Sequence, residues 1–378
     1  MSLAIELFER VKGRDAPAVD SFLRAHSFPI VEGDRVTFVW RGEADEVKLW
    51  HAIYGLPTFQ SFRRIAKTDL WSLVLDLPAG SRMEYKIHVE RNGSKQLLRD
   101  PLNSHLAHDP YGSNSVVYGS GYEPPDWTRL DPEARPGVLE ETEIESRIFR
   151  GRRPVVLYLP ARMRSTRRYP LLVAHDGIDY LRFASFKTVL DNLIHRLEIP
   201  SMIVACTQSP DRMKEYMGDP AHGAFIAEEL VPYVERAYPV SRDASSRGLM
   251  GASLGGVAAL AAAWRHPRAF GRLLLQSGSF AFTDIGRTQR GPIFEPVVEF
   301  VNAFRANPGK PTEKIFVSCG MYESLIYENR SMVPFLERTG MEVKYIESRD
   351  GHNWENWRDR LREGLSWLFP GPLWMIYE

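Results

Sequence analysis

One stretch, Arg247 to Trp264, most constrains the fold, because it contains the spacing G-x-S-x-G at Gly251-Ala-Ser253-Leu-Gly255. A short apolar run precedes the motif, and an alanine-rich segment of high helix propensity follows it. A strand, a sharp turn and a helix are what a nucleophile elbow requires, with small residues that let the strand and helix backbones approach. We therefore interpret Ser253 as a nucleophile, against the alternative of a glycine-rich turn with an incidental serine.

The composition of the chain excludes several classes of partner. With 378 residues, 44% hydrophobic and 25% charged, we expect a soluble globular protein of two domains. Lys+Arg and Asp+Glu are balanced at 48 each, so no basic excess indicates nucleic acid or an anionic membrane. The N-terminal segment lacks the features of a signal peptide, and no segment approaches the roughly 18 apolar residues of a membrane span. We expect a cytoplasmic protein that acts on a small molecule.

The cysteines and histidines give no metal signature. Cys206 and Cys319 lie inside apolar runs, which predicts buried free thiols rather than a disulfide or a metal site. His105, His108 and Asp109 have a suggestive spacing, but they are expected in a Pro/Asn/Gly-rich loop of the N-terminal domain, and no further ligand cluster accompanies them. No P-loop or G-x-G-x-x-G is present. We expect neither a protein-bound metal nor a cofactor.

The first part of the chain is predicted to form a helix followed by an all-β domain. Residues 1–25 have a helical apolar pattern, and from Ile30 to about Val117 the period changes to two. Short strands separated by turn signals are expected at Val36–Trp40, Val47–Trp50, Trp71–Leu77 and Met83–Val89. This spacing predicts an immunoglobulin-like β-sandwich in a domain over residues 1–122. Residues 123–146, rich in Gly, Pro and acidic side chains, are expected to form a linker.

Residues 147–378 alternate between expected strands and helices, which predicts an α/β domain with a mostly parallel sheet covered on both faces. The expected strands are Val155–Leu159, Leu171–Ala174, Met202–Cys206, the run before Ser253, Leu273–Leu275, Ile315–Ser318 and Val343–Ile346. Helices are expected at Phe186–Leu197, at Ala224–Tyr238, after Ser253, and from near Asn353 to a residue before Pro370. This is the order of an α/β hydrolase.

Such a domain presents its triad in the order serine, acid, histidine. Downstream of Ser253 there are two histidines, and His266 lies at the end of the helix after the elbow, where it points away from the turn. His352 lies in a loop between the last expected strand and the final helix, so we expect it to be the general base.

For the acidic member we expect Glu323, which comes directly after the strand at Ile315–Ser318 and can fix the imidazole tautomer. The alternatives are Glu328 and Asp350, the latter too close to His352 on one loop to orient it easily, while Glu323 itself can be read as a helix N-terminal carboxylate.

The oxyanion hole requires two backbone N–H donors. One is expected from Leu254, the residue after the nucleophile, and the other from Ile178 in the loop after an early strand. Gly177 is expected to permit the unusual backbone turn that aims the Ile178 amide inward. His175 and Asp176 are interpreted as residues that shape this loop.

Several blocks, taken together, resemble those of the enterochelin esterases and of the related feruloyl and acetylxylan esterases. These blocks are Asp211–Tyr216, Phe225–Glu235, Arg247–Gly256, His266–Pro267, Phe270–Arg272, Gln276–Ser279 and Gly351–His352. The N-terminal part, with Trp71, Leu77-Pro-Ala-Gly80 and Asp100-Pro-Leu-Asn103, is similar to the early-set sandwich domain that precedes the enterochelin esterase catalytic domain. The resemblance implies a serine esterase with Ser253, His352 and Glu323 as the triad, acting on a small-molecule ester such as a ferric siderophore.

The resemblance places Arg212 in an R-x-x-E block beside the site. It implies that Arg212 contacts an anionic or phenolic substrate, with an ion pair to Glu215 or Asp211 as the equal alternative. The sequence departs from the family after Ser279. The family often has aromatic residues that include tryptophan there, whereas this chain has Phe280-Ala-Phe282. The cationic residues Arg287 and Arg290 follow in the next expected loop. A feruloyl or acetylxylan-type carbohydrate esterase, and a binding or scaffold protein with a relic hydrolase domain, are the other interpretations.

The sandwich is expected to take part in substrate selection, because pockets commonly lie at domain interfaces. Residues 1–120 are predicted to wall one side of the Ser253 pocket. Four aromatic residues near strand turns are the candidates for this role, namely Trp50, Tyr54, Phe59 and Phe62.

Overall fold

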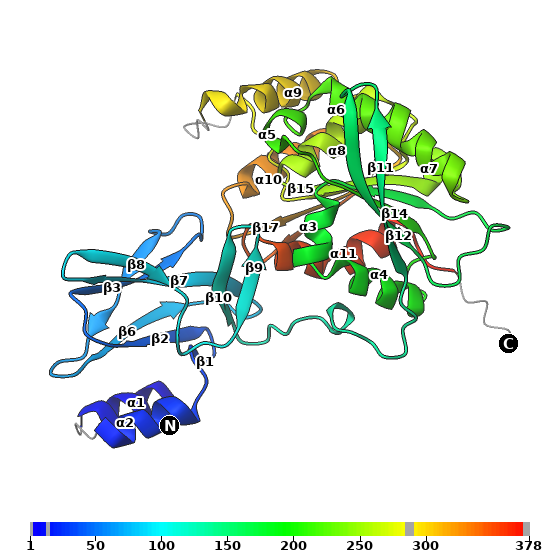
Figure 1. Ribbon diagram of the computed structural model, residues 1–378. Helices are drawn as coiled ribbons and strands as arrows, with labels where there is room; N and C mark the ends of the chain where they lie inside the picture. Colours follow the sequence, from blue (N-terminus) through cyan, green and yellow to red (C-terminus); the bar gives the residue numbers. More distant parts are fainter. Residues whose placement is uncertain (1–2, 13–15, 284–290, 373–378) are drawn as a thin grey trace. The chain divides into compact units, whose positions relative to one another are not determined.

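The computed structural model describes residues 3–12, 16–283 and 291–372, and the chain divides into two compact units (Figure 1). The N-terminal unit comprises Met1–Pro124 together with two short later segments, Met321–Ser324 and Ser348–Asn353. The C-terminal unit comprises the remaining segments, Pro125–Gly320, Leu325–Glu347 and Trp354–Glu378. The two later segments of the N-terminal unit carry Glu323 and His352. The predicted division of the chain at a single linker, residues 123–146, does not include this exchange of segments.

The N-terminal unit begins with two helices, α1 (Leu3–Lys12) and α2 (Ala16–Ala25), rather than the single helix expected over residues 1–25. Their apolar faces bury Leu7 and Phe22 in a small core that also includes Ile30 of the first strand. The helical pattern predicted for this segment is therefore confirmed over Leu3–Lys12 and Ala16–Ala25.

Two antiparallel sheets follow in this unit. The first has the strand order β1 (Ile30–Glu32), β2 (Arg35–Arg41), β6 (Leu70–Asp76) and β5 (Arg63–Arg64). The second has the order β4 (Phe59–Ser61), β3 (Glu46–His51), β7 (Arg82–Arg91), β10 (Gly112–Tyr118) and β9 (Leu106–Asp109), with β8 (Ser94–Leu98) also on β7. The rings of Phe38 and Tyr85 meet edge to face at 4.9 Å, so both sheets contribute to one core.

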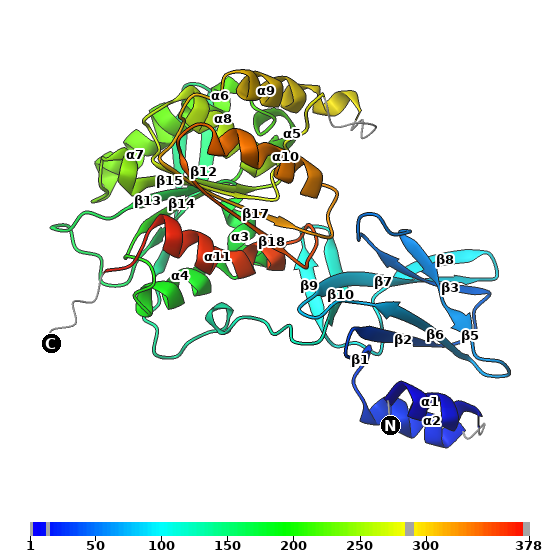
Figure 2. The same cartoon turned by 180° about the vertical axis from the view of Figure 1, so that it is seen from behind.

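The C-terminal unit is built on a mixed sheet (Figures 1 and 2). Among the described residues its strand order is β11 (Val138–Ser146), β12 (Gly151–Leu159), β14 (Ile203–Thr207), β13 (Leu171–Ala174), β15 (Arg247–Ala252), β16 (Arg272–Gln276), β17 (Lys314–Gly320) and β18 (Glu342–Ser348). Strands β14, β13, β15, β16 and β17 run parallel to one another, and β11 and β12 pair antiparallel at one edge. This is an α/β-hydrolase-like arrangement, as the sequence predicts.

Helices cover both faces of this sheet. They are α3 (Gly177–Phe183), α4 (Phe186–His195), α5 (Arg212–Glu215), α6 (Pro220–Ala224), α7 (Val231–Ala237), α8 (Leu254–Arg265), α9 (Glu295–Ala306), α10 (Ile326–Glu337) and α11 (Trp354–Leu368). A π-helical segment η2 (Phe225–Leu230) joins α6 to α7, and the 3₁₀ turns are η1 (Asp126–Thr128), η3 (Ala244–Ser246) and η4 (Pro292–Phe294). No helix in the described part of the chain is long and apolar enough to cross a membrane.

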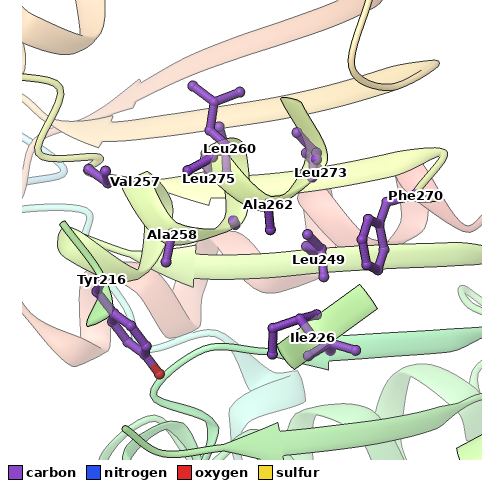
Figure 3. Packing of buried hydrophobic residues seen from close by; sticks show 14 of the residues in the cluster. Tyr216, Ile226, Leu249, Val257, Ala258, Leu260, Ala262, Phe270, Leu273 and Leu275 are labelled. Carbon is purple, nitrogen blue, oxygen red and sulfur yellow. The ribbon is translucent and has the colours of Figure 1, made fainter. Parts of the chain in front are cut away.

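Alternate residues of the central strands belong to the two layers of core. Leu249 and Leu273 pack with α8 residues such as Ala262 on one face, as Figure 3 shows. Met250 and Leu274 pack on the other face with residues of α4 and α11. Because both faces are covered, these strands read as continuous apolar runs, which is why the sequence located them well.

The expected linker at 123–146 is only partly a connection, because residues 138–146 form the edge strand β11. Its acidic side chains are exposed, while Ile144 enters the core. Charged residues are typical of an edge strand that must not pair with another chain, and they gave this segment the composition of a linker.

Candidate active site

Ser253 lies on a strained turn between β15 and α8. Its backbone adopts φ 57° and ψ −122°, and it is the residue that precedes the first turn of α8. The residues on either side, Ala252 and Leu254, are buried, whereas Ser253 is only partly buried. A Cβ on Gly251 would lie 2.3 Å from the carbonyl oxygen of Gly255, so this glycine is required where strand and helix backbones approach. The backbone thus has the geometry of a nucleophile elbow.

The neighbouring strand holds this turn through hydrogen bonds. The Ser253 amide donates to the carbonyl of Gln276 at 2.9 Å, and the Ser279 amide donates to the carbonyl of Ser253 at 3.1 Å. The two serine hydroxyl oxygens lie 3.2 Å apart. No role is predicted for Ser279 from the sequence, although a hydroxyl just after the strand adjacent to the elbow strand is a signal that points to it.

The predicted oxyanion donors both lie in the first turns of helices. Leu254 begins α8, and Ile178 is the second residue of α3. First-turn N–H groups have no acceptor within their own helix, so they are available to an anion. The two turns are adjacent, because a Cβ on Gly255 would lie 3.3 Å from the Cβ of His175.

The prediction that Gly177 permits the unusual backbone turn of this loop is wrong. The left-handed residue of this turn is Asp176, with φ 51°, whereas Gly177 is the first residue of α3. A Cβ on Gly177 would lie 2.4 Å from the Cα of Cys206. Gly177 therefore allows α3 to approach β14 closely, and Asp176 makes the turn.

Arg212 forms an ion pair, but with neither of the partners that the sequence suggested. Its Nε donates to Oδ2 of Asp176 at 2.8 Å. Glu215 instead accepts from Arg153 at 2.7 Å, and Asp211 caps α5 by accepting from the Lys214 amide. Burial raises the pKa of Asp176, and the nearby Arg212 guanidinium opposes that rise. Arg212 thus stabilises the charge of the carboxylate that makes the turn.

His175 is fully buried behind this turn. Its Nδ1 lies 3.0 Å from the carbonyl oxygen of Met250, and its ring centroid is 5.2 Å from that of His222. Burial, and secondarily His222, lower the pKa of His175 to about 3, so the ring is neutral near pH 7. These features agree with a residue that shapes the loop.

Glu323 and His352 form a hydrogen-bonded pair. His352 Nδ1 lies 2.5 Å from Oε2 of Glu323. The Glu323 side chain is 2% exposed, whereas the His352 side chain keeps 36% of its surface exposed. Glu323 follows β17 and His352 lies between β18 and α11, which are the predicted positions. A buried carboxylate in this place selects the tautomer that carries its proton on Nδ1.

The alternative acids have other surroundings. Asp350 Oδ1 accepts hydrogen bonds from the Gly351 amide at 2.7 Å and from Asn353 Nδ2 at 2.8 Å. Burial raises the pKa of Asp350 to about 6, against the lowering effect of Arg82. Glu328 is buried within α10. His266 ends α8, as predicted, at the opposite end of the helix from Ser253.

Other predicted residues fall into three groups. Cys206 and Cys319 are buried free thiols, as expected. Phe62 is buried in the core of the N-terminal unit, which makes it wrong as a substrate-facing candidate, whereas Tyr54 and Phe59 are exposed. Arg287 and Arg290 lie outside the described residues. Within the described ranges, no group of three or more His, Cys, Asp or Glu residues could hold a metal ion.

Comparison with known proteins gives three consistent likenesses. The model of a family described as "Putative esterase" matches residues 146–368. The chain is 26% identical over 371 residues to the iron(III) enterobactin esterase of Escherichia coli K12, covering 87% of this chain and 90% of that protein. The structure resembles that of ferric enterobactin esterase from Salmonella typhimurium, with a TM-score of 0.73, 23% identity, and coverage of 88% of this chain and 93% of the other.

A more distant likeness is to a ferulic acid esterase from Anaeromyces mucronatus, with a TM-score of 0.52 and 16% identity. It covers 64% of this chain and 94% of the other chain. At such identities these two solved structures show a shared fold, and the second covers a much smaller share of this chain than the first.

Proposed function

Because the chain belongs to the esterase family, we propose that it is a serine hydrolase of carboxylic esters with a triad of Ser253, His352 and Glu323. One observation carries the proposal: a strained serine directly precedes α8, and a histidine bonded to a buried carboxylate follows later strands of the same sheet. Strands β15 and β17 are parallel, so the segments that follow them leave the sheet at one edge. Sites in open α/β sheets lie at this edge.

In the first half-reaction the Ser253 hydroxyl oxygen adds to the ester carbonyl carbon, while Nε2 of His352 takes the hydroxyl proton. Glu323 stabilises the resulting imidazolium through its bond to Nδ1. The amides of Leu254 and Ile178 donate to the oxyanion. The carbon–oxygen bond to the alcohol then breaks, and His352 gives its proton to the departing alkoxide.

The second half-reaction releases the acid. A water molecule adds to the acyl carbonyl carbon while His352 takes one of its protons. The same two amides hold the second oxyanion. When the bond to Ser253 breaks, His352 returns the proton to the serine oxygen, and the free enzyme and a carboxylic acid result.

We propose further that the natural substrate is a siderophore ester of the enterobactin class, with iron arriving as part of the substrate. Support comes from the enterobactin esterase that matches over most of both chains. Arg212 is the proposed contact for a phenolate oxygen, since its side chain is 35% exposed and lies beside the Asp176 turn. A guanidinium suits such an oxygen because it donates several hydrogen bonds in one plane.

The test compares the wild type with Ser253→Ala. A fluorophosphonate probe should label the wild type alone, and turnover of p-nitrophenyl butyrate should fall by roughly three orders of magnitude in the variant. A variant that keeps wild-type turnover would end the proposal, and a wild type that fails to label would favour a binding protein with an inactive site.

The substrate class needs a second measurement. Hydrolysis of ferric enterobactin, methyl ferulate and acetylated xylan by the same preparation should show the largest kcat/KM for ferric enterobactin. A larger value for methyl ferulate or acetylated xylan would assign the chain to the carbohydrate esterases while leaving the serine mechanism intact.

A further inference from the structure

The segments that carry Glu323 and His352 are joined to each other by backbone hydrogen bonds. The Met321 amide donates to the carbonyl of Ser348 at 2.7 Å, and the Tyr322 amide donates to the carbonyl of Asp350 at 3.0 Å. These bonds flank the Glu323–His352 pair, so a shift of either segment moves both side chains.

Both segments are also attached to one turn of the two-sheet part of the N-terminal unit, residues 79–82. The hydroxyls of Ser81 and Tyr322 lie 2.5 Å apart, and the Arg82 amide donates to the carbonyl of Arg349 at 2.9 Å. Arg349 in turn donates from Nη1 to the carbonyl of Ala79 at 2.5 Å. The Tyr322 ring packs against the core that the two sheets share.

The Arg82 side chain makes the closest connection to the histidine loop. It is 0% exposed, and its Nη1 donates to Oδ1 of Asn353 at 3.0 Å and to Oδ1 of Asp350 at 3.3 Å. Its Nη2 donates to Glu84 at 3.0 Å. Since Asp350 also accepts from the Gly351 amide, the residues on both sides of His352 are fixed through this one carboxylate and guanidinium.

A buried ion pair of this kind is a poor way to gain stability, because desolvation of both charges offsets most of their attraction. Apolar side chains of similar volume are often as stable at such a position. What the guanidinium provides in addition is direction, since its planar donors reach two loop residues at once.

We propose that Ser81 and Arg82 are positioning residues for the reaction: Arg82 holds the His352 loop through Asp350 and Asn353, and Ser81 holds the Glu323 segment through Tyr322. The proposal rests on the proposed function, in which Glu323 and His352 are the acid–base pair. Catalysis is sensitive to this placement, because a misplacement of about 1 Å can cost on the order of 100-fold.

The first experiment compares Arg82→Met with Arg64→Met. Arg64 is the matched control, because it lies in the same unit and forms an ion pair with Glu43 but is 42% exposed. For Arg82→Met we expect kcat for p-nitrophenyl butyrate to fall by roughly 10- to 100-fold with KM changed less than about threefold. The downfield proton resonance of the His352–Glu323 hydrogen bond should shift or disappear, while Arg64→Met should change neither quantity.

A second set of variants keeps the proposal testable if Arg82→Met does not fold. Asp350→Asn retains an acceptor oxygen for Arg82 and should keep kcat within a few-fold, whereas Asp350→Ala should lose activity as Arg82→Met does. Ser81→Ala, Tyr322→Phe and their double variant should lower kcat to the same extent, because each removes the same hydrogen bond.

The outcomes separate this proposal from the proposed function. If Ser253→Ala is inactive but folded Arg82→Met and Asp350→Ala keep wild-type kcat and an unchanged resonance, Arg82 is not a positioning residue. Equal kcat in Asp350→Asn and Asp350→Ala would also overturn the proposal. If Ser253→Ala is as active as the wild type, the proposed function fails, and this inference fails with it.

Discussion

The proposed nucleophile and the proposed acid–base pair are supported in different ways. Ser253 is held by residues close to it in sequence and by the adjacent strand, with Gly251 packed on Gly255 and its amide bonded to Gln276. Glu323 and His352 are held by contacts of long sequence separation, such as Arg82 to Asp350 across 268 residues. One part of the proposed catalytic machinery is therefore encoded locally, and the other part depends on tertiary structure.

This difference has a physical origin. The elbow sits between a buried strand and a buried helix, and strain at Ser253 persists because tightly packed neighbours fix the backbone on both sides. Loops have no such neighbours along the chain, so side chains on them take one position only where other elements hold them. Substitutions at Glu323, Gly251, Asp350 and Ser279 can show how separate these two kinds of support are.

The largest effect is expected at Glu323. Glu323→Gln keeps the shape of the side chain but removes its charge and favours the wrong histidine tautomer, so kcat should fall by roughly 1,000-fold. Glu328→Gln is the control, since Glu328 is also buried and lies a few residues further along the chain. Steady-state kinetics with p-nitrophenyl butyrate would decide, and a comparable loss in Glu328→Gln alone would transfer the role to that residue.

The next effect concerns the local support of the proposed nucleophile. Gly251→Ala would place a methyl group 2.3 Å from a backbone oxygen, so we expect the free energy of unfolding to fall by about 3 kcal/mol. Gly256→Ala is the matched control, because the atom nearest to a Cβ on Gly256 would be the Cα of Gly278, at 3.3 Å. Urea denaturation of both variants measures the difference, and equal stabilities would mean that the elbow is less tightly packed than described.

A third prediction concerns the tertiary support and its dependence on pH. Burial raises the pKa of Asp350 from 3.8 to about 6, so the folded protein binds this proton more tightly than the unfolded chain does. The contribution to stability is complete below pH 3.8 and is lost as the pH rises through about 6. By pH 7 the loss should amount to about 3 kcal/mol relative to Asp350→Asn.

Urea denaturation of the wild type and of Asp350→Asn between pH 4 and pH 7 isolates this contribution. Arg82 and Glu84 are the charged groups that face Asp350, and both remain in the variant. If the free energy of unfolding changes with pH in the same way in the two proteins, ionisation of Asp350 does not destabilise the folded state. That result would contradict the prediction.

The smallest effect is expected at Ser279, whose hydroxyl lies 3.2 Å from that of Ser253. Ser279→Ala should lower kcat by no more than about fivefold, equivalent to about 1 kcal/mol for one neutral hydrogen bond. Single-turnover acylation by p-nitrophenyl butyrate is the direct measurement. A loss near 100-fold would instead place Ser279 among the groups that activate the proposed nucleophile. The residues that support Ser253 would then extend beyond the elbow motif.

Much of the fold was readable because it repeats simple patterns. The buried parallel strands appeared as apolar runs, and the elbow appeared as a strand, a small-residue turn and a helix around Ser253. The positions of Glu323 and His352 after later strands followed from the chain order of this architecture. The composition gave a wrong prediction at β11, because its exposed acidic side chains belong to an edge strand and not to a linker.

Other features were decided only by the tertiary structure. The sequence could not show that Asp176 rather than Gly177 takes the left-handed conformation, nor that Arg212 pairs with Asp176 across 36 residues. It gave no sign that Arg82 reaches Asp350. Sequence patterns report periodicity and local backbone preference, whereas the partner of a buried charge depends on which distant segments the completed fold brings within hydrogen-bonding distance.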